Sequence, residues 1–321
     1  MLESLKALDT LRINFSNDGV FLVNTILAFI MFGVALEIKP NHFKTLIKNP
    51  KAMITGIASQ FLLLPFITFL LIMAFNSYIT PSIALGMLLV ASCPGGNVSN
   101  FMTNLAKGNT ALSVGLTSVA SIGAIALTPL NFAFWGELYN GFISSQTSDL
   151  IRPLSIDVVQ VFKTIILILG IPLFAGLLIS DRLPKLTEKI IKPIKTASVV
   201  IFLAIVVIGF SKNIDLFLNH IHYVFIIVLI HNAVSLLTGY GVSRYMGLET
   251  KDRRTVTIET GIQNSGLGLA LLFNPAVFPD YLPIGGMMFI TGWWGIWHII
   301  SGLTVAGLWS KLSPIKEKVA A

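Results

Sequence analysis

Charged residues are scarce in this chain, and their scarcity excludes most classes of soluble protein. Lys, Arg, Asp and Glu make up 12% of the 321 residues, whereas a soluble domain carries about a quarter. Hydrophobic residues reach 54%, and the mean hydropathy is +0.81. The composition therefore predicts a protein that is embedded in a lipid bilayer.

Cysteine and the motifs of catalysis are also lacking. Cys93 is the only cysteine, which excludes a disulfide framework and a Cys-rich metal site. We find no G-x-S-x-G, no H-E-x-x-H and no pair of Asp residues within one span, so an intramembrane enzyme is not favoured. The net charge of +7 does not indicate nucleic-acid binding, because the basic residues form short clusters between apolar runs.

Apolar runs of about 20 residues, the length that crosses a bilayer, recur along the chain. They predict an all-α polytopic membrane protein with nine transmembrane helices. The segment 1–17 lacks the features of a cleavable signal peptide, and its leucines at 2, 5, 8 and 11 predict a short interfacial helix. The predicted spans are 18–37, 52–75, 80–106, 109–136, 155–180, 193–211, 221–246, 255–277 and 282–310, and the longest loop is 137–154.

Basic residues are divided unequally between the two ends of these spans. Seventeen of the 22 Lys and Arg lie in alternate loops and in the C-terminal tail, 311–321. The positive-inside rule places that side in the cytoplasm and the N-terminus outside. We therefore expect a multi-pass protein of the cell membrane, the inner membrane in a bacterium, with a periplasmic or extracellular N-terminal segment.

Two of the spans are interrupted near the middle. The span 80–106 contains Cys93–Pro94–Gly95–Gly96, and the span 255–277 contains the polar run 260–266. A single Pro or Gly kink is common in membrane helices. Two matching breaks, each followed by amides and hydroxyls, are instead typical of an inverted-repeat transporter and its binding site.

Polar side chains gather at one depth near these breaks. Counting from the nearest cytoplasmic Lys or Arg, at about 1.5 Å per residue, places seven of them roughly 8–15 Å inside the membrane boundary. These are Gln60, Ser99, Asn100, Ser113, Thr117, Glu259 and Gln263. A carboxylate at such a depth is costly and indicates a functional site, although Glu259 could also be a shallow residue that snorkels beside Arg254.

The chemistry of this set indicates its ligands. Carboxylate, amide and hydroxyl oxygens bind hard cations, and the absence of His and Cys disfavours a transition metal. A single carboxylate suits a monovalent charge, so we expect Na⁺. The second half-helices, which begin near Asn97 and Ser265, should direct free N–H groups toward an anion, and the amides of Asn97 and Asn264 add donors for a carboxylate.

Two segments carry a family resemblance. CPGGNVSNFMTNLAKGNTALSVGLTS (93–118) and IETGIQNSGLG (258–268) closely resemble the bile acid:sodium symporter family, and the resemblance covers nearly the whole chain. It implies a panel and a core, with the two broken helices crossing in the core. Bacterial relatives often have ten helices, and we expect this chain to lack the first of them, as the nine-helix vertebrate carriers do. The first repeat (18–136) would then hold four helices and the second (155–310) five.

The resemblance further implies two sodium sites. The first would use Ser99, Asn100, Ser113, Thr117 and Glu259. The second would use Gln60, Glu259 and Gln263 with the main-chain carbonyls of Thr260 and Ile262.

The last span departs from the bacterial relatives. Ile299 follows His298 where those relatives carry an amide, so contacts of the bile-acid-binding relatives are not carried over. The Trp cluster at 293, 294 and 297 lies mid-span and either packs or lines a cavity. His298 is open to the same two interpretations and is kept as a candidate for substrate binding. His231 and Asn232 are interpreted as a pair that packs or forms hydrogen bonds between helices.

These observations favour a secondary active symporter that couples Na⁺ entry to the uptake of an organic anion by alternating access. A small monocarboxylate, pantoate-like or 2-oxo-acid-like, is favoured over a bile-acid-like amphipathic anion. The alternatives are a proton-coupled carrier that uses Glu259, a channel, and an intramembrane enzyme. The expected partners are sodium ions, the organic anion and the bilayer, with no nucleic acid and no required protein partner.

Overall fold

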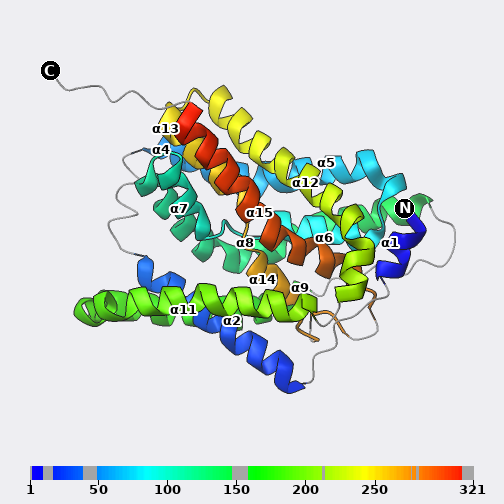
Figure 1. Cartoon of the computed structure of the whole chain (residues 1–321), viewed down its shortest axis with the longest axis horizontal. Coiled ribbons are helices and arrows are strands. Elements are labelled where there is room, and N and C mark those ends of the chain that lie inside the picture. The colour runs from blue at the N-terminus through cyan, green and yellow to red at the C-terminus, as the bar shows by residue number, and fades with distance from the viewer. Residues whose placement is uncertain are drawn as a thin grey trace.

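The structure is a computed structural model that describes residues 2–9, 17–38, 49–146, 158–211, 214–275, 277–279 and 282–312. Helices make up nearly all of this described part (Figure 1). In chain order they are α1 (Leu2–Asp9), α2 (Asn17–Glu37), α4 (Pro50–Ala58), η1 (Ser59–Leu63), α5 (Leu64–Phe75), η2 (Asn76–Tyr78), α6 (Pro81–Ser92), α7 (Val98–Leu105), α8 (Thr110–Gln146), α9 (Val158–Ile165), η3 (Ile166–Gly170), α10 (Ile171–Arg182), α11 (Pro184–Ser211), α12 (Ile214–Tyr245), α13 (Thr250–Gly261), α14 (Ser265–Leu272) and α15 (Gly285–Leu312).

The helices follow the predicted apolar runs, with three corrections at their ends. The predicted loop 137–154 is too long, because α8 continues to Gln146. The helix predicted to begin at 193 begins at Pro184, and the one predicted to begin at 221 begins at Ile214. In each case the helix extends past its apolar part into a more polar segment, so a count of apolar residues finds only the apolar part of the helix. Within the described residues, four helical stretches are by themselves long and apolar enough to cross a membrane: Pro50–Tyr78, Thr110–Ser144, Val159–Arg182 and His222–Tyr245. The total of nine spans therefore stays a prediction.

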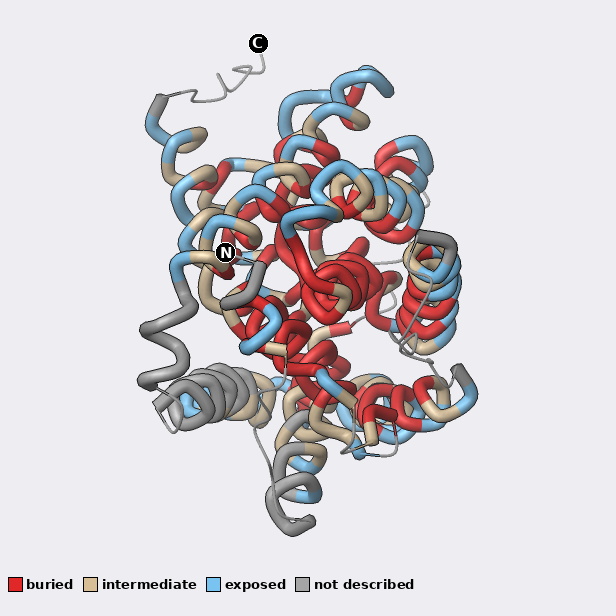
Figure 2. The backbone as a smooth tube through the Cα atoms, turned by 90° about the vertical axis from the view of Figure 1, so that its right-hand side faces the viewer, coloured by how far each residue is buried: buried red, intermediate tan, exposed pale blue. Residues whose placement is uncertain are grey.

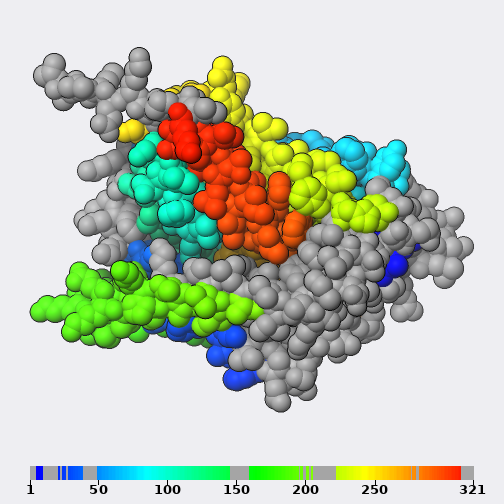
Figure 3. All heavy atoms as spheres, in the orientation of Figure 1, coloured from blue at the N-terminus to red at the C-terminus, as the bar shows by residue number. Residues whose placement is uncertain are grey.

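The helices form two groups, which are visible in Figure 1. One group, here called the α2 group, consists of α2, α10 and α11, which pack against one another at the lower edge of the view. In the other group α12 packs on α13 and α15, and α15 packs on α6 and α14. On the face shown in Figure 3, α7, α12 and α15 lie together, and α11 lies at the lower left. Both broken helices thus belong to the larger group.

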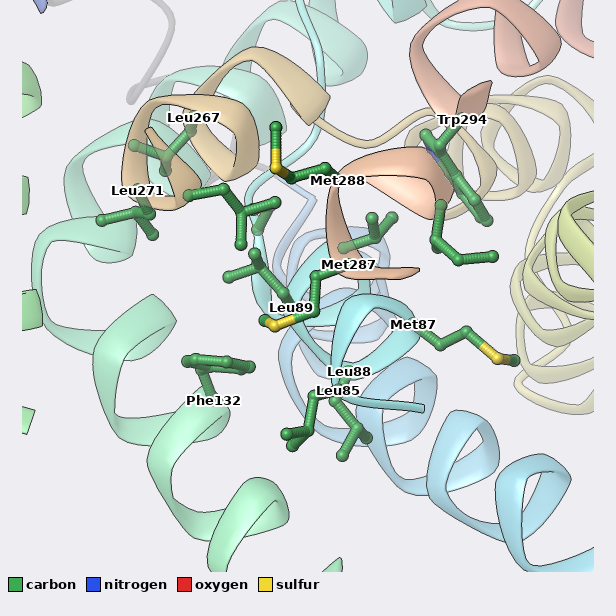
Figure 4. Packing of buried hydrophobic residues seen from close by; sticks show 14 of the residues in the cluster. Leu85, Met87, Leu88, Leu89, Phe132, Leu267, Leu271, Met287, Met288 and Trp294 are labelled. Atoms are coloured by element: carbon green, nitrogen blue, oxygen red, sulfur yellow. The ribbon is translucent and has the colours of Figure 1, made fainter. Parts of the chain in front are cut away.

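Apolar side chains fill the larger group, and Figure 2 shows buried backbone at its centre with exposed residues on the outward faces. Leu85, Leu88, Phe132 and Met287 are wholly buried there, and Figure 4 shows them between α6, α8 and α15. Gly86 lets α6 and α15 approach closely, because a Cβ at this position would lie 2.7 Å from the Cα of Met287. Such tight packing fixes the positions of α6 and of the break that follows it.

Helix N-termini meet at one end of this group. Asn49 caps α4 by accepting a hydrogen bond from the N–H of Ala52, and Asn109 accepts one from Leu112 at the start of α8. The amides of Asn49 and Asn109 both donate to the carboxylate of Asp252 in the first turn of α13, at 2.6 and 2.8 Å. Asp252 thus joins the starts of three helices, which places the loops before α4, α8 and α13 on one side, as the charge pattern predicts.

The predicted interfacial helix is α1, and it packs on the protein itself. Leu5 and Leu8 are fully buried, and α1 contacts α12 and α15. Its last residue, Asp9, accepts a hydrogen bond of 2.9 Å from the hydroxyl of Thr80, which caps α6. The fourth leucine of the pattern, Leu11, lies outside the described residues. Burial of α1 against the bundle explains its leucine spacing better than contact with lipid headgroups alone.

Candidate functional site

The two helix breaks cross and are joined by main-chain hydrogen bonds. The N–H of Gly96 donates to the carbonyl of Ile262 at 2.8 Å, and the N–H of Asn264 donates to the carbonyl of Pro94 at 2.7 Å. Gly95 and Gln263 form an isolated antiparallel bridge between them. Each break therefore satisfies polar groups that the other exposes, which removes much of the cost of unwinding a helix inside a membrane.

Glycine is required at this crossing for steric reasons. A Cβ at Gly95 would lie 2.7 Å from the side-chain nitrogen of Gln60 and 3.0 Å from an oxygen of Glu259. At Gly96 it would lie 3.3 Å from the carbonyl oxygen of Gln263. The Gly-Gly pair therefore allows the side chains of Gln60 and Glu259 and the main-chain carbonyl of Gln263 to reach the crossing.

Hydroxyl and amide groups surround the carboxylate of Glu259. The Ser99 hydroxyl donates to it at 2.6 Å, the Thr117 hydroxyl at 3.0 Å, and the Ser113 hydroxyl by a very short hydrogen bond. The Oδ1 of Asn100 accepts from Ser113 at 2.8 Å and from Thr117 at 3.3 Å. The structure thus brings all five residues predicted for the first sodium site into one cluster, formed by α7, α8 and α13.

Glu259 does not snorkel. Its exposed fraction is 2%, and its carboxylate points to the hydroxyl groups of α7 and α8. Arg254 instead donates to the carbonyl of Ala106 at 2.6 Å and lies over the ring of Trp309. A buried carboxylate that accepts hydrogen bonds only from neutral groups keeps an uncompensated negative charge, and such a group attracts a cation.

A second group of oxygens lies at the main-chain carbonyls of Glu259 and Thr260, near the end of α13. Gln60 donates to the main-chain oxygen of Glu259 at 3.3 Å, and Gln263 donates to that of Thr260 at 2.9 Å. The side-chain oxygen of Gln263 is buried and has no hydrogen-bond partner within the described part of the chain. The carbonyl of Ile262 accepts from Gly96 and keeps a second lone pair. All members of the predicted second site therefore lie around the C-terminal end of α13.

The predicted substrate-binding residues are only partly brought together. Asn97 and Asn264 precede α7 and α14, so both lie at the crossing. Two N–H groups near the start of α14 already have partners: Asn264 donates to Pro94, and Ser265 donates to Gln263 at 2.9 Å. The hydrogen bond from Asn264 to Pro94 joins the two breaks, so this donor is not available to a ligand. Asn264 also accepts from Leu267 through its Oδ1, which leaves its amide N–H₂ as the group that can face a ligand.

His298 and the Trp cluster belong to the packing of α15. Trp294 is fully buried, and its ring lies 4.8 Å from that of His231. Trp297 packs edge-on against Phe225. His298 is nearly buried, and its Nδ1 has no partner among the described residues, but no hydrogen bond in the described part of the chain joins its ring to the crossing. Ile299 packs in a cluster with Met102 and Ile262.

Three further polar contacts between helices lie near the site. The prediction that His231 and Asn232 pair between helices is confirmed: His231 bonds to Thr68 at 2.8 Å, and Asn232 donates to the carbonyl of Gly261 at 2.8 Å. Ser59, which the sequence reasoning missed, bonds to the hydroxyl of Thr260 at 2.8 Å. Ser59 directly precedes Gln60, and both side chains are buried. Its position next to a predicted ligand is the sequence feature that could have identified Ser59.

The fold and this site define a helical multi-pass membrane protein whose two broken helices cross at a cluster of oxygen ligands. The chain belongs to the sodium bile acid symporter family, which residues 24–220 match. This membership confirms the resemblance found in the two sequence segments.

Relatives in bacteria, plants and animals agree with this assignment. The chain is 32% identical to a sodium-dependent transporter, YocS, of Bacillus subtilis (strain 168), over 93% of this chain and 85% of the relative. It is 26% identical to a chloroplastic sodium/metabolite cotransporter, BASS1, of Arabidopsis thaliana, over 90% of this chain and 66% of the relative. It is 29% identical to human sodium/bile acid cotransporter 4, over 78% of this chain and 55% of that protein. These relatives are transporters, and the prediction of a transporter rather than an enzyme is confirmed.

Proposed function

We propose that this protein is a secondary active symporter that couples sodium entry to the uptake of an organic anion. The observation that carries the proposal is the buried carboxylate of Glu259, around which hydroxyl and amide oxygens converge from α7 and α8. Four neutral oxygen donors around one carboxylate suit a monovalent hard cation. The names of the relatives, which include sodium-dependent transporters and cotransporters, support the same ion.

Two sodium ions fit the two groups of oxygens around Glu259. The first would bind among the side chains of Ser99, Asn100, Ser113, Thr117 and Glu259. The second would bind among Gln60, Gln263, Glu259 and the carbonyls of Thr260 and Ile262, and the unpartnered oxygen of Gln263 supports this arrangement. Because both groups share Glu259, binding of the ions is coupled through one carboxylate.

The substrate would bind at the crossing, next to the starts of α7 and α14. The amides of Asn97 and Asn264 offer donors for a carboxylate, and the positive ends of the two half-helices favour an anion. Ser265 and His298 remain candidates for further contacts. We favour a small monocarboxylate, pantoate-like or 2-oxo-acid-like, and place an amphipathic bile-acid-like anion second.

The arrangement of the helices supports alternating access. In our proposal the α2 group acts as a panel and the larger group as a core, and the repeats 18–136 and 155–310 are related by inverted topology. Movement of the core against the panel would expose the crossing to each side in turn. The N-terminus lies outside, and the C-terminal tail is in the cytoplasm of a cell whose membrane, the inner membrane in a bacterium, holds the nine spans.

Liposomes that contain the purified protein test this proposal. An inward Na⁺ gradient should drive uptake of radiolabelled pantoate or a 2-oxo acid, and a K⁺ gradient of equal ionic strength should not. Uptake driven by a pH gradient without Na⁺ would favour the alternative in which Glu259 carries a proton. A binding screen in saturating Na⁺ should compare the acids and taurocholate with neutral amides of the same acids. Equal binding of the amides would overturn the anion assignment.

A further inference from the structure

The lipid-facing side of α12 carries a hollow that the proposed transport site does not use. This groove has a volume of about 390 Å³ and an almost wholly apolar lining, which includes Leu63 and Ile67 on one side and Leu237 and Gly241 on the other. A Cβ at Gly241 would meet no heavy atom within 4 Å. The missing side chain at Gly241 thus keeps this part of the groove open to the bilayer.

The groove lies at the depth of the acyl chains of one leaflet. On α12, which ends at Tyr245, the lining extends from Val242 back to Val234. At about 1.5 Å per residue, this stretch lies roughly 5–17 Å from the end of the helix. One leaflet of the hydrocarbon core is about 15 Å deep. The groove therefore matches the leaflet on the side that the charge pattern predicts to be cytoplasmic.

Basic groups lie at the end of the groove. The guanidinium carbon of Arg253 is 5.8 Å from the centre of the Tyr240 ring, and the exposed Arg244 follows Gly241 by three residues, on the same face of α12. Arg253 donates to the carbonyl of Leu248 at 3.1 Å, and its Nε is buried without a partner among the described residues. The two guanidinium groups therefore leave donors for a further acceptor group.

The nearby carboxylates do not neutralise this end. The carboxylate of Asp252 accepts from Asn49 and Asn109 and is thereby held on the side of α4 and α8. Glu249 is exposed in the turn between α12 and α13. The amino group of Lys51 lies near the same turn, 4.0 Å from where a Cβ of Gly247 would be. The end of the groove therefore keeps a positive surplus, which attracts anionic lipid headgroups.

We propose that the groove and these arginines together bind one anionic phospholipid, with an acyl chain along Leu63, Leu237 and Gly241 and the phosphate at Arg244 and Arg253. The apolar groove matches the acyl chain of such a lipid, and the two guanidinium groups at the membrane surface match its phosphate. Because α12 packs closely on α13, the lipid would strengthen the contact that supports the broken helix. This inference does not depend on the ion or substrate that the protein transports.

Thermal unfolding of the delipidated protein in detergent tests the proposal. Phosphatidylglycerol should raise the melting temperature at lower concentration than phosphatidylcholine with the same acyl chains, and native mass spectrometry should show one retained phosphatidylglycerol. The double variant Arg244→Gln/Arg253→Gln should weaken the apparent affinity for phosphatidylglycerol about 30-fold, the effect of two surface charges, and leave phosphatidylcholine unchanged. The matched control Arg182→Gln/Lys192→Gln removes two exposed charges from α10 and α11 and should keep the wild-type preference.

A second variant tests the groove without touching the charges. Gly241→Leu adds a side chain in open space, so it should fold normally and should weaken binding of both lipids. Inorganic phosphate at matched ionic strength should not reproduce the stabilisation. The proposal is overturned if the wild type does not distinguish the two lipids, if the double arginine variant keeps the full preference, if Gly241→Leu binds phosphatidylglycerol normally, or if phosphate alone gives the same shift.

Discussion

The N–H of Gly96 lies 2.8 Å from the carbonyl oxygen of Ile262, so the two broken helices are hydrogen bonded at the point where each unwinds. The same peptide segment brings Gly95 against Gln60 and Glu259. A change in either break is therefore transmitted directly to both groups of oxygens. This contact explains why the two breaks, which are far apart in the sequence, form one site.

Gly95→Ala should strongly reduce the response to Na⁺ while the protein still folds. The added methyl group would lie 2.7 Å from the Gln60 nitrogen and 3.0 Å from a Glu259 oxygen, so both side chains must move. We expect the Na⁺-dependent rise in melting temperature to fall to less than half of the wild-type value, because ligand stabilisation follows the affinity.

Gly141→Ala is the matched control for this substitution. Gly141 lies in α8, and a Cβ there would meet nothing within 4 Å. The exchange should leave the Na⁺ response unchanged and raise the melting temperature slightly, because alanine favours the helix. A Gly95→Ala protein that responds to Na⁺ like the wild type would show that the contact with Gln60 and Glu259 is not needed.

Glu259→Gln should remove both Na⁺ stabilisation and Na⁺-driven transport. The amide keeps the shape of the side chain but removes the charge that would offset two cations. Folding should survive, since loss of a buried charge is not itself destabilising. Glu137→Gln, which alters an exposed carboxylate on α8, is the control and should behave like the wild type.

Gln60→Ala separates the two proposed ion sites. It removes a ligand of the second site alone, so a partial Na⁺ response should remain. If Gln60→Ala abolished the response as completely as Glu259→Gln, the two groups of oxygens would act as a single site. Isothermal titration with Na⁺ in a K⁺ background measures the number of ions in each variant.

Much of this site could be predicted from the sequence, for a physical reason. Glu259, Ser99 and Thr117 carry polar groups at a depth where only a partner or a ligand can satisfy them, and that cost is visible in the sequence itself. Depth along a helix follows from a constant rise per residue, so residues on different helices could be placed at one level.

The remaining features depend on partners that are distant in the sequence. The N–H groups of Asn264 and Ser265 form hydrogen bonds at the crossing of the two breaks. Which residues of the two breaks lie opposite each other is not determined by local sequence. The extension of α8 to Gln146 continues beyond the apolar part that marks the membrane. The contacts of Asp252 with Asn49 and Asn109 span 203 and 143 residues, so no local pattern indicates them.

Asn232→Ala should weaken Na⁺ binding by about tenfold without touching a proposed ligand. Asn232 is fully buried, donates to the carbonyl of Gly261 at 2.8 Å and accepts from Ser301 at 2.5 Å. It thereby holds the last carbonyls of α13, among which the second ion would bind. Ser235→Ala is the control, since that buried hydroxyl bonds only within its own helix, to His231. Equal Na⁺ affinities in the two variants would exclude a positioning role for Asn232.

Asp9 should make the stability of the protein depend on pH near neutrality. Burial at the end of α1 raises the pKa of this carboxyl from 3.8 to about 7, against a smaller lowering by the hydrogen bond from Thr80. Between these two values the folded state binds more protons than the unfolded state, so the free energy of unfolding falls as pH rises from about 4 to about 7. Above pH 7 the charged carboxylate is present in both states, and the penalty is constant.

Asp9→Asn should remove this slope, because the amide keeps a hydrogen-bond acceptor for Thr80 and carries no charge at any pH. We expect the variant to melt roughly 3 °C or more above the wild type at pH 8 and close to it at pH 4. Thermal unfolding at constant Na⁺, in steps between pH 4 and pH 8, measures the difference. Glu188→Gln, which changes an exposed carboxyl on α11, should leave the wild-type slope intact. A slope that persists in Asp9→Asn would assign the pH dependence to another group and show that the α1 carboxyl is ionised without cost.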